Sequence, residues 1–297
     1  MNASDILGVD LTPRNVRVVL VDDEGRVAGR AEGASEELLG VTEVVLREAG
    51  LARPRLVGLA VVELRGPELQ PAVDALSSAW NASVRPEVVG WGSALALGEA
   101  WCGAARQAST VVGLALGERA SAGLVLEGRL WTGARRLAGS VAWLALNPVE
   151  REDYRKLGCL EAEVGAAGVV RRLVWRIKAG DRSRVLDAAG GDLSAITLDH
   201  VLAGARDGDG VAISVIRDTV KYLGMAVANL AAVIDPDIVV LGGSIQTAGD
   251  LLLEPIRAEC ARRMPPQMSR SLPIELAALG ADAPAIGAAR HALTARS

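Results

Sequence analysis

Residues 211–246, VAISVIRDTVKYLGMAVANLAAVIDPDIVVLGGSIQ, decide the fold. Apolar residues recur there at spacings of four and three, which places them in one stripe along a long helix; they are Ile216, Val220, Leu223, Val227, Leu230 and Ile234. Asp235-Pro236-Asp237 ends this helix, because proline disfavours helical geometry in the preceding residue and has no backbone N–H. Residues 238–241 are apolar, as in a strand covered on both faces. The stretch therefore predicts a helix, a tight turn, a buried strand, a glycine turn and a second helix.

The glycine turn itself is a candidate nucleotide site. Gly242, Gly243 and Ser244 follow the buried strand directly, and ligands of open α/β sheets usually bind at such strand ends. A plain turn between strand and helix explains the same residues, since a Gly-Gly pair alone is weak evidence for a site. Both interpretations stay open at this point.

The composition predicts a large globular protein. Half of the 297 residues are apolar and the mean hydropathy is +0.27, so two domains with substantial cores are expected. The 32 basic and 36 acidic residues give a net charge of −4, which offers no electrostatic case for binding nucleic acid. No apolar run is long enough to cross a membrane, and residues 1–5 lack the pattern of a secretion signal. A cytoplasmic location is therefore predicted.

Cysteine and histidine are too scarce for most metal or disulfide frameworks. Cys102, Cys159 and Cys260 lie far apart in the chain, which favours reduced and mostly buried thiols. His200 and His291 are the only imidazoles. A histidine-rich zinc site and a histidine-based triad are therefore not expected.

A hairpin followed by a helix occurs twice, from residue 6 and again from residue 110, which predicts two similar α/β domains facing a cleft. The expected strands are 6–10, 16–21, 26–32, 56–62, 85–89, 110–116, 121–126, 128–130, 238–241 and 274–277. One expected helix starts near residue 35. The other expected helices cover 71–80, 94–107 with Ser93 as cap, 160–178, 181–189, 197–206, 251–263 and 283–295. The charged run 150–156 is interpreted as a solvated loop, and Pro265-Pro266 as a break.

With these elements placed, the sequence resembles the ROK family of sugar kinases and sugar-responsive repressors, which share the actin/hexokinase fold. The matching stretches are residues 8–22, Ala94-Leu95-Ala96-Leu97-Gly98-Glu99, Gly158-Cys159-Leu160-Glu161, 235–244 and 285–289. The resemblance implies two actin-like (ribonuclease H-like) domains around a central cleft. Residues 1–108 with 281–297 would form the N-terminal domain, and residues 109–280 the larger C-terminal one.

The family's two phosphate loops are altered in this sequence. Asp10 matches the first residue of the family's Asp-x-Gly-Gly-Thr turn, but Thr12, Pro13 and Arg14 replace the small residues that follow. Proline removes one N–H donor, and arginine replaces the hydroxyl. In the second loop, residues 117–123, Glu118 adds a negative charge that repels phosphate unless Arg119 compensates it.

The residues that the resemblance assigns to catalysis and to sugar binding are replaced as well. The family's catalytic aspartate, which accepts the proton of the attacking sugar hydroxyl, falls on Trp91, and indole cannot accept a proton at neutral pH. The sugar-contacting Glu-x-Gly-His segment runs from Ser140 to Trp143 and has lost its carboxylate and imidazole. Trp91 and Trp143 are interpreted either as core or interface residues or as plugs of the former sugar cleft.

The remaining family positions point to structural roles. Two of the family's three zinc-binding cysteines fall on Glu152 and Tyr154, which leaves Cys159 alone, so no zinc is expected and Cys159 is interpreted as a small buried residue. Glu99 and Glu161 match the family but are assigned to helix packing or capping.

Three functions remain open from the sequence. The first is a degenerate ROK protein that binds a ligand or partner without phosphorylating sugar, because base, sugar contacts, zinc ligands and phosphate loops are all altered. The second is an ATP-dependent sugar kinase with another base, such as Asp10. The third is the effector and dimerisation part of a regulator without its DNA-binding domain. A homodimer, a sugar-like ligand and no membrane are expected, and Mg-ATP would contact Asp10, Gly242, Gly243 and Ser244.

Overall fold

The computed structural model describes residues 5–80, 83–117 and 119–295. Two sequence predictions fall on other residues: four of the five residues examined for a secretion signal are residues 1–4, and the negative charge of the second phosphate loop belongs to Glu118. Both lie outside the described residues.

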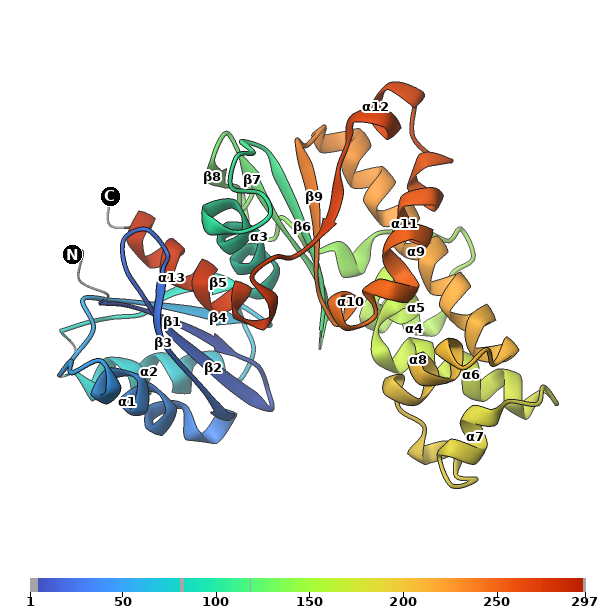
Figure 1. Cartoon of the computed structure of the whole chain (residues 1–297), viewed down its shortest axis with the longest axis horizontal. Coiled ribbons are helices and arrows are strands. Elements are labelled where there is room, and N and C mark those ends of the chain that lie inside the picture. The colour runs from blue at the N-terminus through green and yellow to red at the C-terminus, as the bar shows by residue number, and fades with distance from the viewer. Residues whose placement is uncertain (1–4, 81–82, 118, 296–297) are drawn as a thin grey trace.

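Two five-stranded sheets organise the chain, one in each lobe (Figure 1). The first has the order β3-β2-β1-β4-β5, formed by β1 (Ile6–Leu11), β2 (Asn15–Val21), β3 (Val27–Ala34), β4 (Leu56–Val61) and β5 (Glu87–Gly90). The second has the order β10-β9-β6-β7-β8, formed by β6 (Val111–Leu116), β7 (Ala120–Leu126), β8 (Arg129–Leu130), β9 (Ile238–Gly243) and β10 (Ile274–Leu276). In both sheets three strands pair antiparallel and two more add in parallel. This shared topology confirms the repeated α/β pattern.

The unit from residue 211 to residue 246 folds as predicted. Helix α9 (Gly210–Ile234) begins where the Asp209 carboxylate accepts from the Ala212 N–H, and it ends at Asp235 with a left-handed φ of 49°. Leu223 and Val227 on its apolar stripe are fully buried. Strand β9 then pairs in parallel with β6 in the middle of its sheet. The short helix α10 (Ser244–Thr247) follows without a loop.

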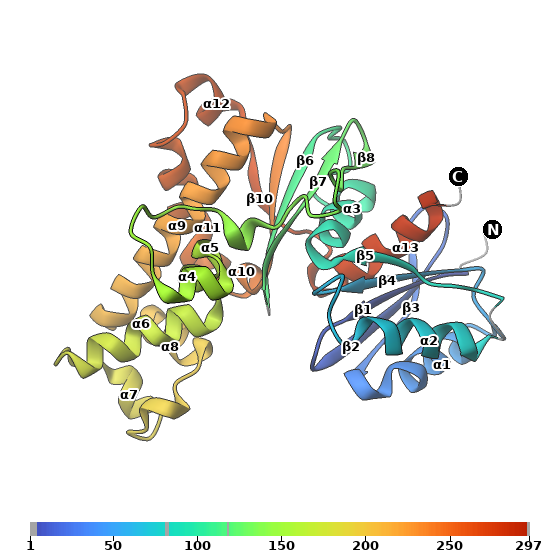
Figure 2. The same ribbon diagram turned by 180° about the vertical axis from the view of Figure 1, so that it is seen from behind.

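Helix α13 (Ala283–Ala295) returns the chain to the first lobe. It packs against β1 and β4 and against α3 (Trp91–Cys102), which Figures 1 and 2 show between the two sheets. A methyl group on Gly287 would lie 1.7 Å from the Ala94 carbonyl oxygen, so glycine is required where the two helices cross. The termini lie near each other on this lobe (Figure 1). The domain boundaries at residues 108 and 281 stay a prediction that agrees with this path.

The other face of the first sheet is covered by α1 (Leu38–Glu48), which a 3-10 turn at Ser35–Glu37 precedes, and by α2 (Leu69–Ala79) (Figure 2). The second lobe carries the remaining helices: α4 (Glu152–Leu157), α5 (Cys159–Val164), α6 (Ala166–Lys178), α7 (Arg184–Ala188), α8 (Leu198–Arg206), α11 (Gly249–Ala261) and α12 (Pro266–Ser271). Within the described ranges, none of the helices has both the length and the apolar character that a membrane crossing requires.

Two predicted helices differ from the structure. Helix α3 starts at Trp91, directly after β5, with the extended residue Gly90 as its cap, so Ser93 is not the cap and the helix ends at Cys102, before Gln107. The predicted helix 160–178 is two helices, because Gly165 has extended backbone with ψ of 152° and breaks the hydrogen-bond ladder.

The segment predicted as a solvated loop is helical, whereas the predicted break at Pro265-Pro266 is confirmed, since it separates α11 from α12. The charged run 150–156 forms α4 from Glu152 onward, with acidic residues in its first turn and basic residues in its last, an arrangement that suits the helix dipole. Buried Tyr154 anchors this helix to the second lobe. Pro266 lies in the first turn of α12, where the missing N–H of proline costs no hydrogen bond. Charge and proline content alone did not reveal these contacts.

Candidate functional site

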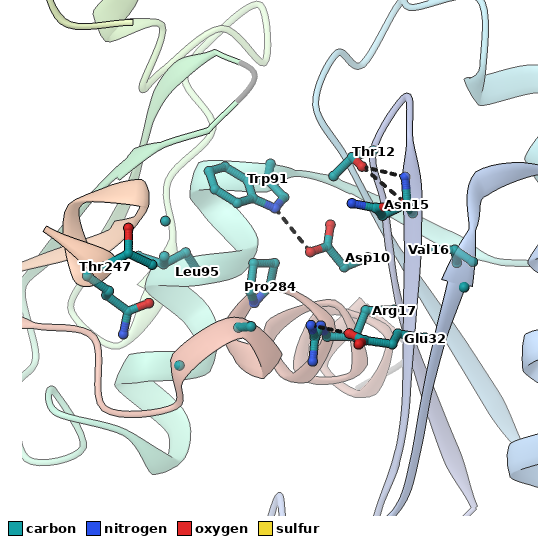
Figure 3. A pocket seen from close by; sticks show the side chains of 15 residues that line it. Asp10, Thr12, Asn15, Val16, Arg17, Glu32, Trp91, Leu95, Thr247 and Pro284 are labelled. Atoms are coloured by element: carbon teal, nitrogen blue, oxygen red, sulfur yellow. Dashed lines mark hydrogen bonds and ion pairs between the residues drawn. The ribbon is translucent and has the colours of Figure 1, made fainter. Parts of the chain in front are cut away.

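Two cavities lie between the lobes. The first, here called the Asp10 cavity, has a volume of about 810 Å³ and is lined by residues that include Asp10, Arg17, Trp91, Gly243 and Pro284 (Figure 3). The second, the Trp143 cavity, has a volume of about 680 Å³ and is lined by residues that include Trp91, Ser140 and Trp143. Trp91 lines both cavities, so it separates them.

The Trp91 indole fills the point where three turns converge. Its Nε1–H donates to Asp10 Oδ2 at 3.2 Å, at the end of β1 (Figure 3). A methyl group built on Gly117, directly after β6, or on Gly243, the last residue of β9, would lie 2.9 Å from ring atom Cη2. Because α3 follows β5 without a loop, its first side chain is directed at these strand ends. The ring thus occupies the space beside both glycine turns.

Asp10 is a buried carboxyl with an incomplete set of partners. Its side chain is 8% exposed, and its Oδ1 atom has no hydrogen-bond partner among the described residues. Burial raises the pKa of Asp10 to about 7, an effect that the Trp91 hydrogen bond and the Arg17 charge reduce but do not cancel. Near neutral pH the Asp10 carboxyl is therefore present in both its protonated and its ionised form.

The turn after β1 is closed by its own hydrogen bonds. Thr12 Oγ1 donates to the Asn15 carbonyl oxygen and accepts from the Asn15 N–H, both at 3.0 Å (Figure 3). The Thr12 N–H also donates to Asn15 O, at 2.9 Å, and Pro13 has no N–H to offer. The turn therefore presents few free donors to a phosphate group.

The glycine pair at the end of β9 has a packing role. Gly243 has a φ of +69°, and a methyl group on it would lie 1.8 Å from the Leu116 carbonyl oxygen. A methyl group on Gly242 would lie 2.1 Å from Leu95 Cδ1. Of the three predicted nucleotide contacts, Gly243 lines the Asp10 cavity, whereas Gly242 and Ser244 are not among its described lining residues. Nucleotide binding by this turn stays a prediction.

Trp143 does not plug the second cavity. It lies in the 3-10 turn Val141–Trp143, its side chain is 56% exposed, and the cavity beside it stays open. Ser140, which the family resemblance also assigns to sugar contact, lines the same cavity, and its hydroxyl donates to the Leu137 carbonyl oxygen at 2.7 Å. The hypothesis of a plug is therefore wrong for Trp143, while Trp91 does fill space between the cavities.

The region in which the family resemblance placed zinc contains a network of side-chain hydrogen bonds. The Tyr154 hydroxyl donates to Glu163 Oε1, and Arg172 Nη1 pairs with Glu163 Oε2 at 2.7 Å. Asn147 Nδ2 donates to the hydroxyls of Tyr154 and Tyr222, each at 3.2 Å. The described residues contain no cluster of histidine, cysteine and carboxylate groups that could hold a metal. Polar side chains hold these loops together here, and the donor set does not fit zinc.

The two retained family glutamates have structural roles, as predicted. Glu99 is fully buried, and its carboxylate accepts from the N–H groups of Ala104, Ala278 and Leu279 at 2.7, 3.0 and 2.9 Å. It thereby ties α3 to the segment that leads into α13. Glu161 accepts from the Ala120 N–H at the start of β7, and burial raises its pKa.

The profile of the ROK family matches residues 41–295. The chain belongs to the ROK family. A glucokinase from Thermotoga maritima is 27% identical over 96% of both chains. A glucokinase from Halalkalibacterium halodurans is 32% identical over 65% of this chain, which spans 58% of that relative. A xylose repressor from Caldicellulosiruptor bescii is 29% identical over 54% of this chain and 40% of its own length.

The fold agrees with this membership. A ROK family glucokinase from Streptomyces griseus, solved with glucose and AMPPNP, superimposes with a TM-score of 0.79 at 23% identity, covering 97% of this chain and 99% of the other. The actin-like hexokinase fold predicted for this ROK protein is therefore confirmed.

Several site features escaped the sequence analysis. The hydrogen bond between Trp91 and Asp10 joins residues 81 positions apart, and the network on Glu163 includes Arg172 and Thr219. No local pattern marks either contact. Arg135-Arg136 was visible as a basic pair in the loop after β8, but its neighbours across the cleft were not.

Proposed function

We propose that this ROK protein is a regulatory scaffold that binds a small sugar-like ligand or a partner and does not phosphorylate sugar. The position of Trp91 carries the proposal. Phosphoryl transfer needs a group that accepts the hydroxyl proton and room for the phosphates beside donor groups. At this point of the chain an indole without acceptor capacity lies against Gly117 and Gly243.

The neighbouring turns support the same conclusion. Thr12 and Asn15 use their hydrogen-bonding groups on each other, and Pro13 contributes no donor. The Trp143 cavity stays open, so a ligand can enter it even though the turns around the Asp10 cavity disfavour a nucleotide. This ROK protein would then act as a regulator whose contacts with a partner depend on the bound ligand. Its similarity to a xylose repressor supports this proposal. The effector and dimerisation part of a regulator is the form of this proposal closest to that relative, with a homodimer as the expected assembly.

A second candidate is an ATP-dependent sugar kinase that uses Asp10 as its base. The pKa of Asp10 is raised to about 7, close to the working pH of a general base. The similarity to a glucokinase over 96% of the chain also favours this candidate. Mg-ATP would then have to enter the Asp10 cavity with Trp91 displaced.

Calorimetric titration with Mg-ATP, followed by a phosphate-transfer assay with hexoses, separates the two candidates. We expect neither binding heat nor transfer for the parent protein. Trp91→Ala, which clears the space beside Gly117 and Gly243, should gain nucleotide binding. The control Trp175→Ala, which removes an exposed tryptophan from α6, should not. Sugar-stimulated ATP turnover by the parent that is lost in Asp10→Asn would refute the scaffold and establish the kinase.

A further inference from the structure

The Trp143 cavity carries an excess of positive charge. Its cationic lining side chains are Arg65, Arg119, Arg135, Arg136 and Lys156. Glu63 is the single carboxylate among the described lining residues. A site for a neutral ligand has no need of this imbalance, because uncompensated cations around a cavity repel one another.

Most of this charge is not neutralised by neighbouring groups. Glu63 is already used by Arg119, whose Nη2 lies 2.7 Å from Glu63 Oε1 and so links the two lobes. In the described part of the chain, Arg65, Arg135 and Arg136 take part in no ion pair and no side-chain hydrogen bond. Three guanidinium groups, each with several donors, therefore remain available to a ligand.

These arginines come from both sides of the cleft. Arg65 follows β4 in the first lobe, whereas Arg135 and Arg136 lie in the loop after β8 in the second. That loop is fixed in place: the Ala122 N–H donates to Gly139 O at 2.8 Å, and Arg136 is held at a φ of 58°. A ligand between these groups would contact both lobes.

Other lining groups suit the body of a sugar-sized molecule. Trp143 and Leu137 are 56% and 59% exposed and offer an apolar surface for the face of a sugar ring. Ser121 also lines the cavity, but its Oγ atom is buried and has no hydrogen-bond partner among the described residues, so it is not counted among the ligand contacts. The cavity thus combines an apolar wall with an arginine cluster.

Resting on the proposed ligand-binding function, we infer that the Trp143 cavity selects an anionic sugar derivative carrying a phosphate or carboxylate group. Arginine forks match both groups through paired charge-assisted hydrogen bonds. The neutral hydroxyls of an unmodified hexose cannot use three free guanidinium groups in this way. The anion would bridge Arg65 and the Arg135-Arg136 loop.

The test compares glucose, glucose 6-phosphate, glucuronate and inorganic phosphate by calorimetry and by tryptophan fluorescence at low and high salt. At least one charged sugar should bind 10-fold or more tightly than glucose, and the difference should shrink with added salt. Preference for glucose 6-phosphate or for glucuronate identifies the charged group. Equal affinity for glucose and both charged sugars, or no binding of any probe, would overturn the inference.

Variants separate a site from general surface charge. Arg135→Gln/Arg136→Gln and, from the opposite lobe, Arg65→Gln should each weaken binding of the charged sugar 10-fold or more, and should weaken it more than they weaken binding of glucose. Arg47→Gln, an exposed arginine on α1, is the matched control. Equal losses in the control would overturn the inference. Phosphate transfer from ATP to glucose, measured separately, would refute the proposed function and leave the charge preference standing.

Discussion

Replacing Asp10 with asparagine should stabilise the protein at neutral and alkaline pH. The carboxyl is 8% exposed, and burial raises its pKa from 3.8 to about 7. Between these values the folded state holds a proton that the unfolded chain has released. The contribution of Asp10 to stability is therefore complete below pH 3.8 and is lost as the pH rises through about 7.

The size of the effect follows from the same values. One pKa unit corresponds to about 1.4 kcal/mol, so the whole interval amounts to about 4 kcal/mol. Asparagine has no charge to bury and keeps an oxygen that accepts from the Trp91 N–H. The stability difference between variant and parent should therefore grow by roughly 2–3 kcal/mol from about pH 5 to about pH 8.

Urea unfolding of parent, Asp10→Asn and Glu43→Gln at several pH values measures this difference. Glu43 is an exposed carboxyl on α1 and serves as the control for loss of one negative charge. The Glu43→Gln curve should stay parallel to that of the parent. A constant gap between parent and Asp10→Asn over the whole pH range would refute the reasoning about a buried, protonated Asp10.

Three further substitutions test the structure through the free energy of unfolding. Glu163→Gln leaves Arg172 without its buried partner and should lower the free energy of unfolding by about 3 kcal/mol. EDTA should leave the melting temperature of the parent unchanged, and a drop with EDTA would contradict a hydrogen-bond network in place of a metal site. Gly243→Ala should destabilise far more than Gly50→Ala, because both have a φ of +69° but only Gly243 faces a carbonyl oxygen; equal losses would show that backbone strain alone matters. Glu99→Gln weakens three N–H contacts and should cost about 3 kcal/mol, so an unchanged unfolding midpoint would argue against its bracing role.

Local sequence patterns were sufficient for most of the fold. The structure confirms three of them: the apolar stripe of α9, the Asp-Pro-Asp turn and the apolar run 238–241. Each pattern reflects the burial and the dihedral preferences of residues that are neighbours in the chain. The repeated hairpin and helix predicted the shared topology of the two sheets for the same reason. Helix ends were less well predicted, because Gly90 and Gly165 act through backbone geometry that composition does not reveal.

The sequence also determined which functional groups are available. The family resemblance assigns Trp91 to the position of the catalytic base, and an indole cannot accept a proton whatever its packing. The same holds for the replaced zinc ligands and for the two histidines. Which chemical groups a given position supplies can be identified without coordinates.

Only the tertiary structure decided what these residues do. Asp10, Trp91, Gly117 and Gly243 lie on four separate strand ends, and their contacts exist because two sheets converge on one cleft. The arginines of the Trp143 cavity likewise come from both lobes. Side-chain periodicity records whether a residue is buried, but it carries no information about which distant residue it meets. The blocked turn and the basic cavity therefore follow from the packing of the two domains.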